Sequence, residues 1–369
     1  IPNPTKDTFV CYQGEETKII NDIYGGGDNG PIESSTKVYI ISGNIGGSAY
    51  AAGNGASAIV KQNSYISAQG NTQITNHLFG GGNAAANGNE GDAVIALVDV
   101  SGAVIGGNLY GGANSSVING QTIVNVGMQA INDYYAAEQT MQKGKIYITG
   151  TIFGGGESMD PTKEFNYDTI SVTGNTTITV DGKGYETSET DTNTFDFKSS
   201  IFGSGNASRS GKNSYINVRN YGKKDGFKRA ISLQRATEVS IDNSTIYLDG
   251  TTDSTAGEFA NVLFTFNQIG HLKIRKGTTL YLENGLRKNK ISYEYDGIEE
   301  LNYKIKKGDK LGCVTIKYRD TELFTMDVYL ESELEYYHPL IYTVIIISFI
   351  VMILSLRAIL RRKKKKKYK

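Results

Sequence analysis

The sequence predicts an all-β fold: a parallel β-helix or β-solenoid, a small membrane-proximal β-domain and one C-terminal transmembrane helix. Three observations predict it. A glycine-rich motif recurs along the chain, short runs of alternating apolar residues accompany it, and a long uncharged stretch precedes a basic end. With 369 residues the chain is long enough for two or three folded units. We expect a repeat region at 1–290, a β-domain at 291–336, a transmembrane helix at 337–360 and a basic tail at 361–369.

The recurring motif is a pair of apolar or aromatic residues followed by glycines. Its five copies begin at Ile23, Leu78, Leu109, Ile152 and Ile201, at intervals of 55, 31, 43 and 49 residues. A motif repeated every few tens of residues is typical of a repeat architecture, and unequal intervals indicate loops of different length. Because 36 of the 44 glycines lie in residues 1–226, we expect them to form the corners, with positive φ.

Short alternating runs predict the strands. Residues 145–157, KIYITGTIFGGGE, contain the whole unit: a strand, a tight turn, two apolar residues and a glycine corner. Apolar residues at every second position place one face of a strand in a core. Ile146 and Ile148 should therefore point inward, and Lys145 and Tyr147 outward.

The rest of the repeat region fits the same architecture. Residues 1–290 contain no amphipathic helical stretch of useful length, and we interpret 231–286 as the last coils and a cap. The competing architecture is a β-sandwich or a string of hairpins.

Two residue types recur beside the glycines. Asparagine, which tolerates a left-handed backbone and can hydrogen-bond along a stack, occurs at Asn29, Asn44, Asn54, Asn83 and Asn114. An aromatic ring precedes the glycines at Tyr24, Phe79, Tyr110, Phe153 and Phe202. These rings either pack as a structural ladder or face a ligand.

The C-terminal end predicts a membrane anchor. Residues 340–356 carry no charge, and the stretch as far as Leu360 precedes RRKKKKKYK. About 21 helical residues rise roughly 31 Å, which matches a hydrocarbon core. Lys and Arg beside a span stay cytoplasmic, so we expect a single-pass protein of the plasma membrane with an extracellular N-terminal part and a cytoplasmic tail. The lipid bilayer would be a partner through Leu340–Leu360. Because the chain begins at Ile1 without a Met, either a signal peptide was removed or further residues precede it.

The distribution of charge argues against nucleic acid as a partner. The chain holds 38 basic and 38 acidic side chains, but nine of the basic ones lie between Arg357 and Lys369. The remainder has 29 basic and 38 acidic groups, a net charge of −9. Nucleic-acid binding needs a basic surface instead.

Two parts of the chain resemble known families. The glycine motifs and alternating runs of residues 20–285 are similar to the glycine-rich β-strand repeats of bacterial adhesin-like surface proteins, which implies a bacterial cell surface but no particular ligand. YKIKKGDKLG at 303–312, VTI at 314–316 and MDVYL at 326–330 lie within residues 300–336. This segment resembles the membrane-proximal C-terminal β-domain of D-alanyl-D-alanine carboxypeptidases. That β-domain is a non-catalytic spacer, so the resemblance implies a stalk, although this chain has only part of such a domain.

No complete catalytic set is present, and we predict no catalytic, cofactor-binding or metal-binding residues and no cofactor. A carboxypeptidase needs a serine with a lysine one helical turn later, an SxN element and a KTG strand. Ser34 and Lys37 have the spacing of this serine and lysine, but Lys37 begins an apparent strand rather than lying in a helix. Neither KTG nor KSG occurs in the sequence. The glycines between Gly25 and Gly30 match a dinucleotide pattern, but Pro31 follows where a helix would have to begin.

The sequence therefore predicts a membrane-anchored structural or adhesion protein of a bacterial cell surface rather than an enzyme. Repeats stacked in one dimension form a long face, which suits glycans, cell wall or surface proteins as partners. The alternative is an enzyme that acts on polysaccharide or peptidoglycan. Such an enzyme would be a β-helix lyase or hydrolase, or the C-terminal part of a carboxypeptidase-like protein.

Overall fold

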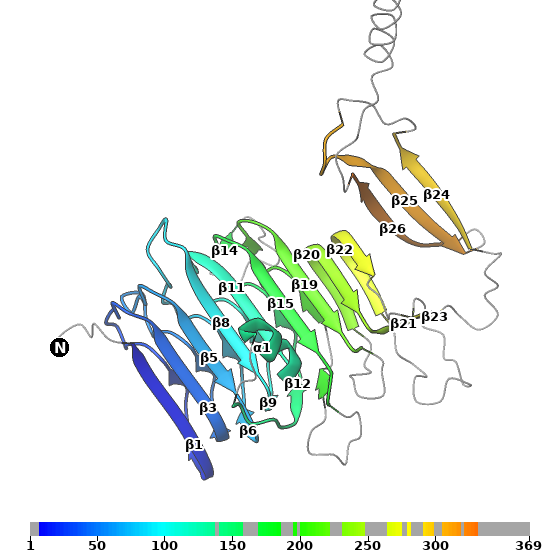
Figure 1. Cartoon of the computed structure of the whole chain (residues 1–369). Coiled ribbons are helices and arrows are strands. Elements are labelled where there is room, and N and C mark those ends of the chain that lie inside the picture. The colour runs from blue at the N-terminus through cyan, green and yellow to red at the C-terminus, as the bar shows by residue number, and fades with distance from the viewer. Residues whose placement is uncertain are drawn as a thin grey trace, which may run out of the picture. The chain divides into compact units, whose positions relative to one another are not determined.

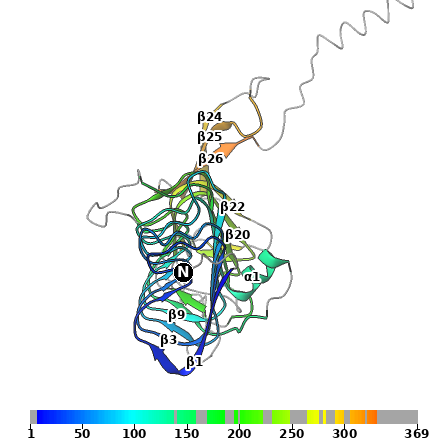
Figure 2. The same cartoon turned by 90° about the vertical axis from the view of Figure 1, so that its left-hand side faces the viewer.

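The computed structural model describes residues 7–136, 140–157, 169–185, 195–197, 200–221, 231–247, 264–274, 279–281, 291–298, 305–318 and 321–330. Within these residues the chain is all-β apart from one short helix. Nineteen of the described strands, between β1 and β22, form one large sheet whose strand pairs are parallel. The sheet curls coil upon coil into a solenoid-like half-barrel, in which strands of successive coils lie side by side (Figures 1 and 2). The predicted parallel, repeat-based β architecture is confirmed at this level.

Each coil passes through three faces, which we name by their strands. The long face contains β1 (Thr8–Ile19), β3 (Thr36–Ile45), β5 (Ser64–Ala68), β8 (Val94–Val100), β11 (Gly120–Val126), β15 (Thr176–Asp181), β19 (Ser214–Arg219), β20 (Ile231–Asp242) and β22 (Phe264–Ile274). The short face contains the end of β3 with β6 (Thr72–Ile74), β9 (Ala103–Ile105), β12 (Ile146–Ile148) and β16 (Phe195–Phe197). The aromatic face contains β2 (Ile23–Tyr24), β4 (Ala49–Tyr50), β7 (Leu78–Phe79), β10 (Leu109–Tyr110), β13 (Ile152–Phe153) and β17 (Ser200–Phe202).

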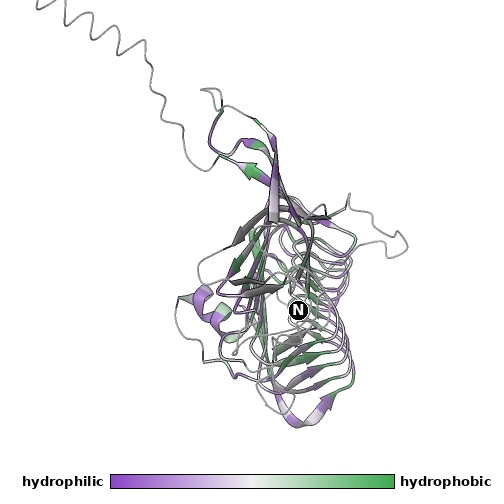
Figure 3. Cartoon of the chain, turned by 90° about the vertical axis from the view of Figure 1, so that its right-hand side faces the viewer, coloured by the Kyte–Doolittle hydropathy of each residue, from purple (hydrophilic) through white to green (hydrophobic). Residues whose placement is uncertain are grey.

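The core lies inside the coils because alternate side chains of each strand point inward. On the long face one inward row runs through seven strands, and every member is fully buried: Val38, Ile66, Val98, Val124, Ile178, Ile216 and Val239. Burial of one such side chain contributes about 1.5–3 kcal/mol to stability. In β12, Ile146 and Ile148 are buried and Tyr147 is half-buried, as the alternation predicts. Figure 3 shows hydrophobic and hydrophilic residues on the same strands, as this alternation requires.

The corner glycines are needed for close approach between coils. The prediction of positive φ is wrong for the glycines of the repeated motif, since none of them is among the positive-φ glycines of the described residues, although other glycines of the repeat region, such as Gly43 and Gly70, do have positive φ. A carbonyl oxygen of the next coil fills the place of a side chain instead. A Cβ on Gly80 would lie 2.3 Å from the oxygen of Gly111, and a Cβ on Gly111 would lie 2.4 Å from the oxygen of Gly154. A side chain on Gly80 or Gly111 would meet this oxygen, so the neighbouring coils would have to move apart there.

The aromatic residues of the motif form a continuous stack on the aromatic face. Neighbouring ring centroids are 4.6–5.2 Å apart along Tyr24, Tyr50, Phe79, Tyr110, Phe153 and Phe202. The rings thus pack as a structural ladder, one of the two predicted roles, and each stacked pair adds about 0.5–1.5 kcal/mol. Tyr50 belongs to a coil that the sequence pattern misses, since alanines stand in place of its first two glycines. This coil divides the 55-residue interval into 26 and 29 residues.

A ladder of asparagine side chains runs beside the aromatic stack. Asn54 Nδ2 donates to Asp28 Oδ1 over 2.9 Å, Asn83 Nδ2 donates to Asn54 Oδ1 over 2.9 Å, and Asn114 Nδ2 donates to Asn83 Oδ1 over 2.8 Å. The predicted hydrogen bonding of Asn54, Asn83 and Asn114 along the stack is therefore confirmed. Asn29 is left-handed, with φ of 55°.

Four shorter strands lie outside the large sheet, in two pairs. These are β14 (Ile170–Val172) with β18 (Arg209–Ser210), and β21 (Thr245–Tyr247) with β23 (Thr279–Tyr281). A separate three-stranded sheet contains β24 (Ile291–Gly297), β25 (Lys310–Tyr318) and β26 (Thr321–Tyr329). A turn at the KKGD sequence of residues 306–309 precedes β25: Lys306 N donates to Asp309 Oδ2 over 2.8 Å, and Gly308 has φ of 91°. The proposed boundaries between the regions remain predictions.

The predicted fold class and location need correction where they involve a transmembrane helix. The helix that the structure describes, α1 (Met128–Tyr135), has eight residues. It rises only about 12 Å, against roughly 30 Å for a hydrocarbon core. No helix within the described residues is long and apolar enough to cross a bilayer. The segment Leu340–Leu360, with the predicted bilayer contact and the tail at 361–369, lies outside the described residues. The fold is accordingly all-β with one short helix, and a single-pass protein of the plasma membrane is not supported.

Candidate functional site

The outward side of the long face carries a group of aromatic side chains near the N-terminal coils. In β3 and β5 the inward positions are buried valine, isoleucine and alanine, so Tyr39 and Tyr65 lie on the other side of the strands. The ring centroids of Tyr39 and Tyr65 are 5.3 Å apart, and those of Phe9 and Tyr39 are 5.2 Å apart. Three neighbouring coils thus present aromatic rings to solvent.

Helix α1 lies across the outward side of the same face (Figures 1 and 2). It begins after Gly127, whose φ of 102° turns the chain out of β11, and ends at the left-handed Ala136. Ala130 and Ile131 are buried. The opposite side of the helix is hydrophilic (Figure 3). Its last turn contributes two further tyrosines, Tyr134 and Tyr135, whose centroids are 4.9 Å apart.

An open groove of about 470 Å³ lies between the outward side of the long face and α1, and we call it the tyrosine groove. Its lining combines tyrosine rings with a few polar groups: Asp7, Ser35, Thr36, Lys37, Tyr39, Asn63, Ser64, Tyr65, Ile95, Leu97, Tyr134 and Tyr135. At the rim, Lys37 Nζ lies 2.9 Å from Asp7 Oδ2. This hydrogen bond with Lys37 lowers the pKa of Asp7. Such a mixture of aromatic surface and sparse polar groups is typical of ligand sites.

A buried carboxylate fixes the tyrosines of the groove. Asp99, fully buried in β8, accepts hydrogen bonds from Asn125 Nδ2 over 2.9 Å and from the Tyr135 hydroxyl over 3.1 Å. The Tyr65 hydroxyl donates to it as well. Burial raises the pKa of Asp99 to about 6, although these hydrogen bonds act in the opposite direction. Asp99 therefore links Tyr65 on the sheet to Tyr135 on α1, while its own oxygens are closed off from solvent.

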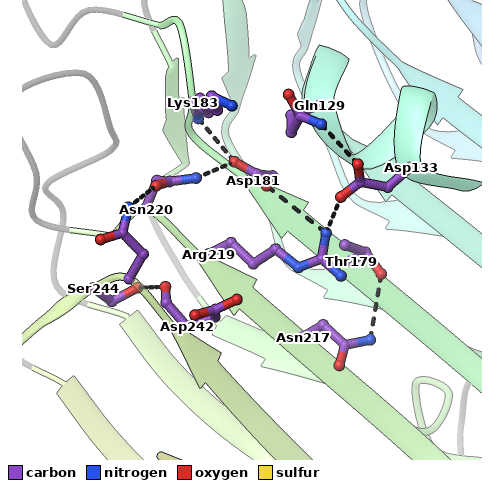
Figure 4. Close-up of polar contacts among 11 residues, drawn as sticks. Gln129, Asp133, Thr179, Asp181, Lys183, Asn217, Arg219, Asn220, Asp242 and Ser244 are labelled. Carbon is purple, nitrogen blue, oxygen red and sulfur yellow. Dashed lines mark hydrogen bonds and ion pairs between the residues drawn. The ribbon is translucent and has the colours of Figure 1, made fainter. Parts of the chain in front are cut away.

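A second buried carboxylate holds the helix from the other side. Arg219 of β19 forms an ion pair with Asp133 of α1, and its Nη1 lies 4.0 Å from Asp181 Oδ2 (Figure 4). The Asp181 side chain is only 2% exposed and also accepts from Asn220 Nδ2 over 2.6 Å. Burial raises the pKa of Asp181 above its ordinary value. Within α1, Gln129 Nε2 donates to Asp133 Oδ1 over 2.7 Å. The helix is thus attached to the sheet along its length.

The residues considered for carboxypeptidase chemistry do not come together as a site. Ser34 is buried, whereas Lys37 lies on the outward side of β3 and pairs with Asp7. Within the part of the chain that the structure describes, no cluster of three His, Cys, Asp or Glu side chains could hold a metal ion.

The tyrosine groove could not be located from the sequence, because it combines residues up to 128 positions apart. The sequence holds one signal for the position of Tyr65 on the long face. The sequence NSYI occurs at 63–66 and again at 213–216, and both copies lie at the same place on that face.

Comparison with known proteins gives no relatives: no protein-family model, curated protein or solved structure matches the chain. The resemblances to adhesin-like repeats and to the carboxypeptidase β-domain rest on the sequence motifs alone.

Proposed function

We propose that this chain is a structural and adhesion protein of a bacterial cell surface, which binds glycans in the tyrosine groove without chemical turnover. The groove is the observation that carries the proposal. Sugar rings present apolar C–H faces and many hydroxyl groups. Tyrosine suits both, because its ring packs against apolar surface and its hydroxyl forms hydrogen bonds.

The composition of the groove supports a glycan more than an apolar ligand. Tyr39, Tyr65, Tyr134 and Tyr135 provide the aromatic surface, and Asp7, Lys37 and Asn63 provide hydrogen-bonding groups at the same site. The hydrogen bonds to Asp99 hold the Tyr65 and Tyr135 hydroxyls in place. Such preorganisation favours binding because less side-chain freedom is lost when a ligand enters.

The proposal is tested by titrating the full-length chain with a panel of neutral and acidic oligosaccharides and peptidoglycan fragments. Replacing Tyr39, which is half-buried in the groove, removes a stacking surface, so Tyr39→Ala should weaken binding about tenfold. Tyr147→Ala is the matched control: Tyr147 is also half-buried on a strand, but lies on the short face. Binding that is absent, or equally reduced by both changes, contradicts the proposal.

A second candidate is a polysaccharide-acting enzyme, which one observation favours. Asp99 borders the groove through Tyr65 and Tyr135, and its pKa of about 6 suits proton transfer near neutral pH. Its complete burial argues against this role, because a catalytic acid must reach the substrate. Product release should be measured on the same panel. Turnover that Asp99→Asn abolishes while binding persists would favour the enzyme.

A further inference from the structure

The tyrosine rings of the groove are arranged differently from the rings of the aromatic stack. In the aromatic stack the closest pairs of rings lie nearly parallel, with interplanar angles of 4° and 1°. In the groove, the planes of Tyr134 and Tyr135 meet at 88°, and those of Tyr39 and Tyr65 meet at 68°. Rings set at large angles surround a site from several sides, whereas parallel rings form a flat wall. The groove therefore suits a rounded group better than a flat one.

The rings of the groove are also accessible, whereas the central rings of the aromatic stack are buried. Tyr134 is 41% exposed, and the other three tyrosines are half-buried. Ile95 adds an apolar side chain to the lining. The face of an aromatic ring attracts a cation, most strongly a weakly hydrated one such as a methylated ammonium group, which also has an apolar surface. Several tyrosines around one rounded space are the side chains that such a group requires.

A negative charge lies behind two of these rings. Asp99 accepts hydrogen bonds from the hydroxyls of Tyr65 and Tyr135 and from Asn125. All three donors are neutral side chains, so they share the charge of the carboxylate without cancelling it. A pKa of about 6 leaves Asp99 mainly ionised at neutral pH. Water screens a buried charge only weakly. Asp99 therefore favours a cation in the groove, although its own oxygens are closed off from solvent.

The charged side chains that line the groove, Lys37 and Asp7, form an ion pair with each other. Their contact raises the pKa of Lys37 and lowers the pKa of Asp7, so both stay ionised at neutral pH. The pair contributes no net charge. Among the described residues that line or fix the groove, the net charge is thus that of Asp99.

We propose that the tyrosine groove binds an organic ammonium group, held by cation–π contacts with its four tyrosine rings and by the charge of Asp99. A glycan that carries ammonium groups is then the ligand class, which rests on the proposed glycan binding. A free quaternary amine presents the same chemistry to the groove. The experiments below separate these two sources.

The test is calorimetric titration of the full-length chain with choline and with 3,3-dimethylbutanol, in which carbon replaces the charged nitrogen of choline. At pH 7.5 choline should bind about tenfold more tightly than this neutral analogue. Asp99→Asn removes the charge and should lower the preference for choline several-fold. Asp181→Asn is the matched control, because Asp181 is also a buried carboxylate that contacts α1 through Arg219 but does not line the groove. Its preference should stay within twofold, and a ratio of two affinities does not depend on the folded fraction.

The pH dependence separates the effect of charge from that of shape. A bound cation favours ionised Asp99, so the affinity for choline should fall several-fold from pH 7.5 to pH 5, as Asp99 takes up a proton. Binding of 3,3-dimethylbutanol should not change, and Asp99→Asn should abolish the pH dependence. Other groups of the groove titrate outside this range, since the pKa of Asp7 lies below its ordinary value and those of Lys37 and three tyrosines lie above theirs. These tyrosines are Tyr65, Tyr134 and Tyr135.

The source of the ammonium group is distinguished with two chito-oligosaccharides of equal length, one acetylated and one trimethylated at its amino groups. Tighter binding of the trimethylated oligomer than of choline and of the acetylated oligomer, lost in Asp99→Asn, identifies a glycan that carries ammonium groups. Binding of choline but of neither oligomer identifies the free amine and contradicts the proposed glycan binding. Equal binding of the two oligomers, with equal affinities for choline and 3,3-dimethylbutanol, leaves glycan binding in place and overturns the ammonium site. Equal losses of preference in Asp99→Asn and Asp181→Asn overturn it as well.

Discussion

Asp99 and Asp181 show what a single buried carboxylate does in this fold. Both lie on the outward side of the long face, yet α1 and its side chains cover them almost completely. Burial is the first cause of the raised pKa of each. Their hydrogen-bond partners offset only part of the desolvation, so each carboxylate fixes α1 at a cost in stability near neutral pH.

We expect stability to depend on pH through Asp99. Its folded pKa of about 6 exceeds the ordinary value of 3.8, so the folded chain binds this proton more tightly. The contribution of Asp99 to the free energy of unfolding should therefore be largest below about pH 4, fall as pH rises from about 4 to 6, and stay lower above that, by roughly 3 kcal/mol at most. Urea unfolding at pH 5 and pH 7.5 measures the difference. Asp99→Asn should reduce this difference in the free energy of unfolding, and Asp181 should leave a smaller pH dependence in the same direction. An unchanged difference between pH 5 and pH 7.5 in Asp99→Asn would contradict the attribution of the pH dependence to Asp99.

At the scale of elements, the corners decide how closely the coils stack. We expect Gly111→Ala to destabilise the chain by about 1–3 kcal/mol, because its Cβ would lie 2.4 Å from the oxygen of Gly154 and the coils must separate. Gly30→Ala is the control, since no atom lies within 4 Å of the Cβ position there. That change should be neutral or slightly stabilising. Urea unfolding gives the free energy of unfolding of both variants. Equal losses would show that the close contact between neighbouring coils is not the reason for glycine at position 111.

The elements also show what the sequence could and could not predict. Alternation identified Ile146 and Ile148 as inward residues because strand period is a local property. The coil containing Tyr50 was missed because alanine can replace glycine at its corner. Helix α1 was missed because it is only eight residues long and is held by Asp99 and Arg219, which lie far from it in sequence. Short helices depend on tertiary contacts more than on propensity.

For the whole sheet, the tyrosine groove follows from coil registry, which no local pattern contains. The tyrosine groove requires Tyr39 and Tyr65 to be neighbours across coils and α1 to fold back toward them. Sequence motifs predicted the repeat but not which loops would be long, so they could not predict where a face would be left uncovered.

Stacking in one dimension makes each coil depend on its neighbours, so one charge in a central coil should weaken the whole sheet. Ile148 is fully buried and pairs with Ile105 of β9 on one side and with β16 on the other. Ile148→Asp would bury a carboxylate without a partner between coils, and should cost several kcal/mol. Tyr147→Asp places the same group on the outward side of the same strand and should cost far less. Thermal unfolding measures both variants. Equal falls in the midpoint would mean that the inward register of β12 does not hold the coils together.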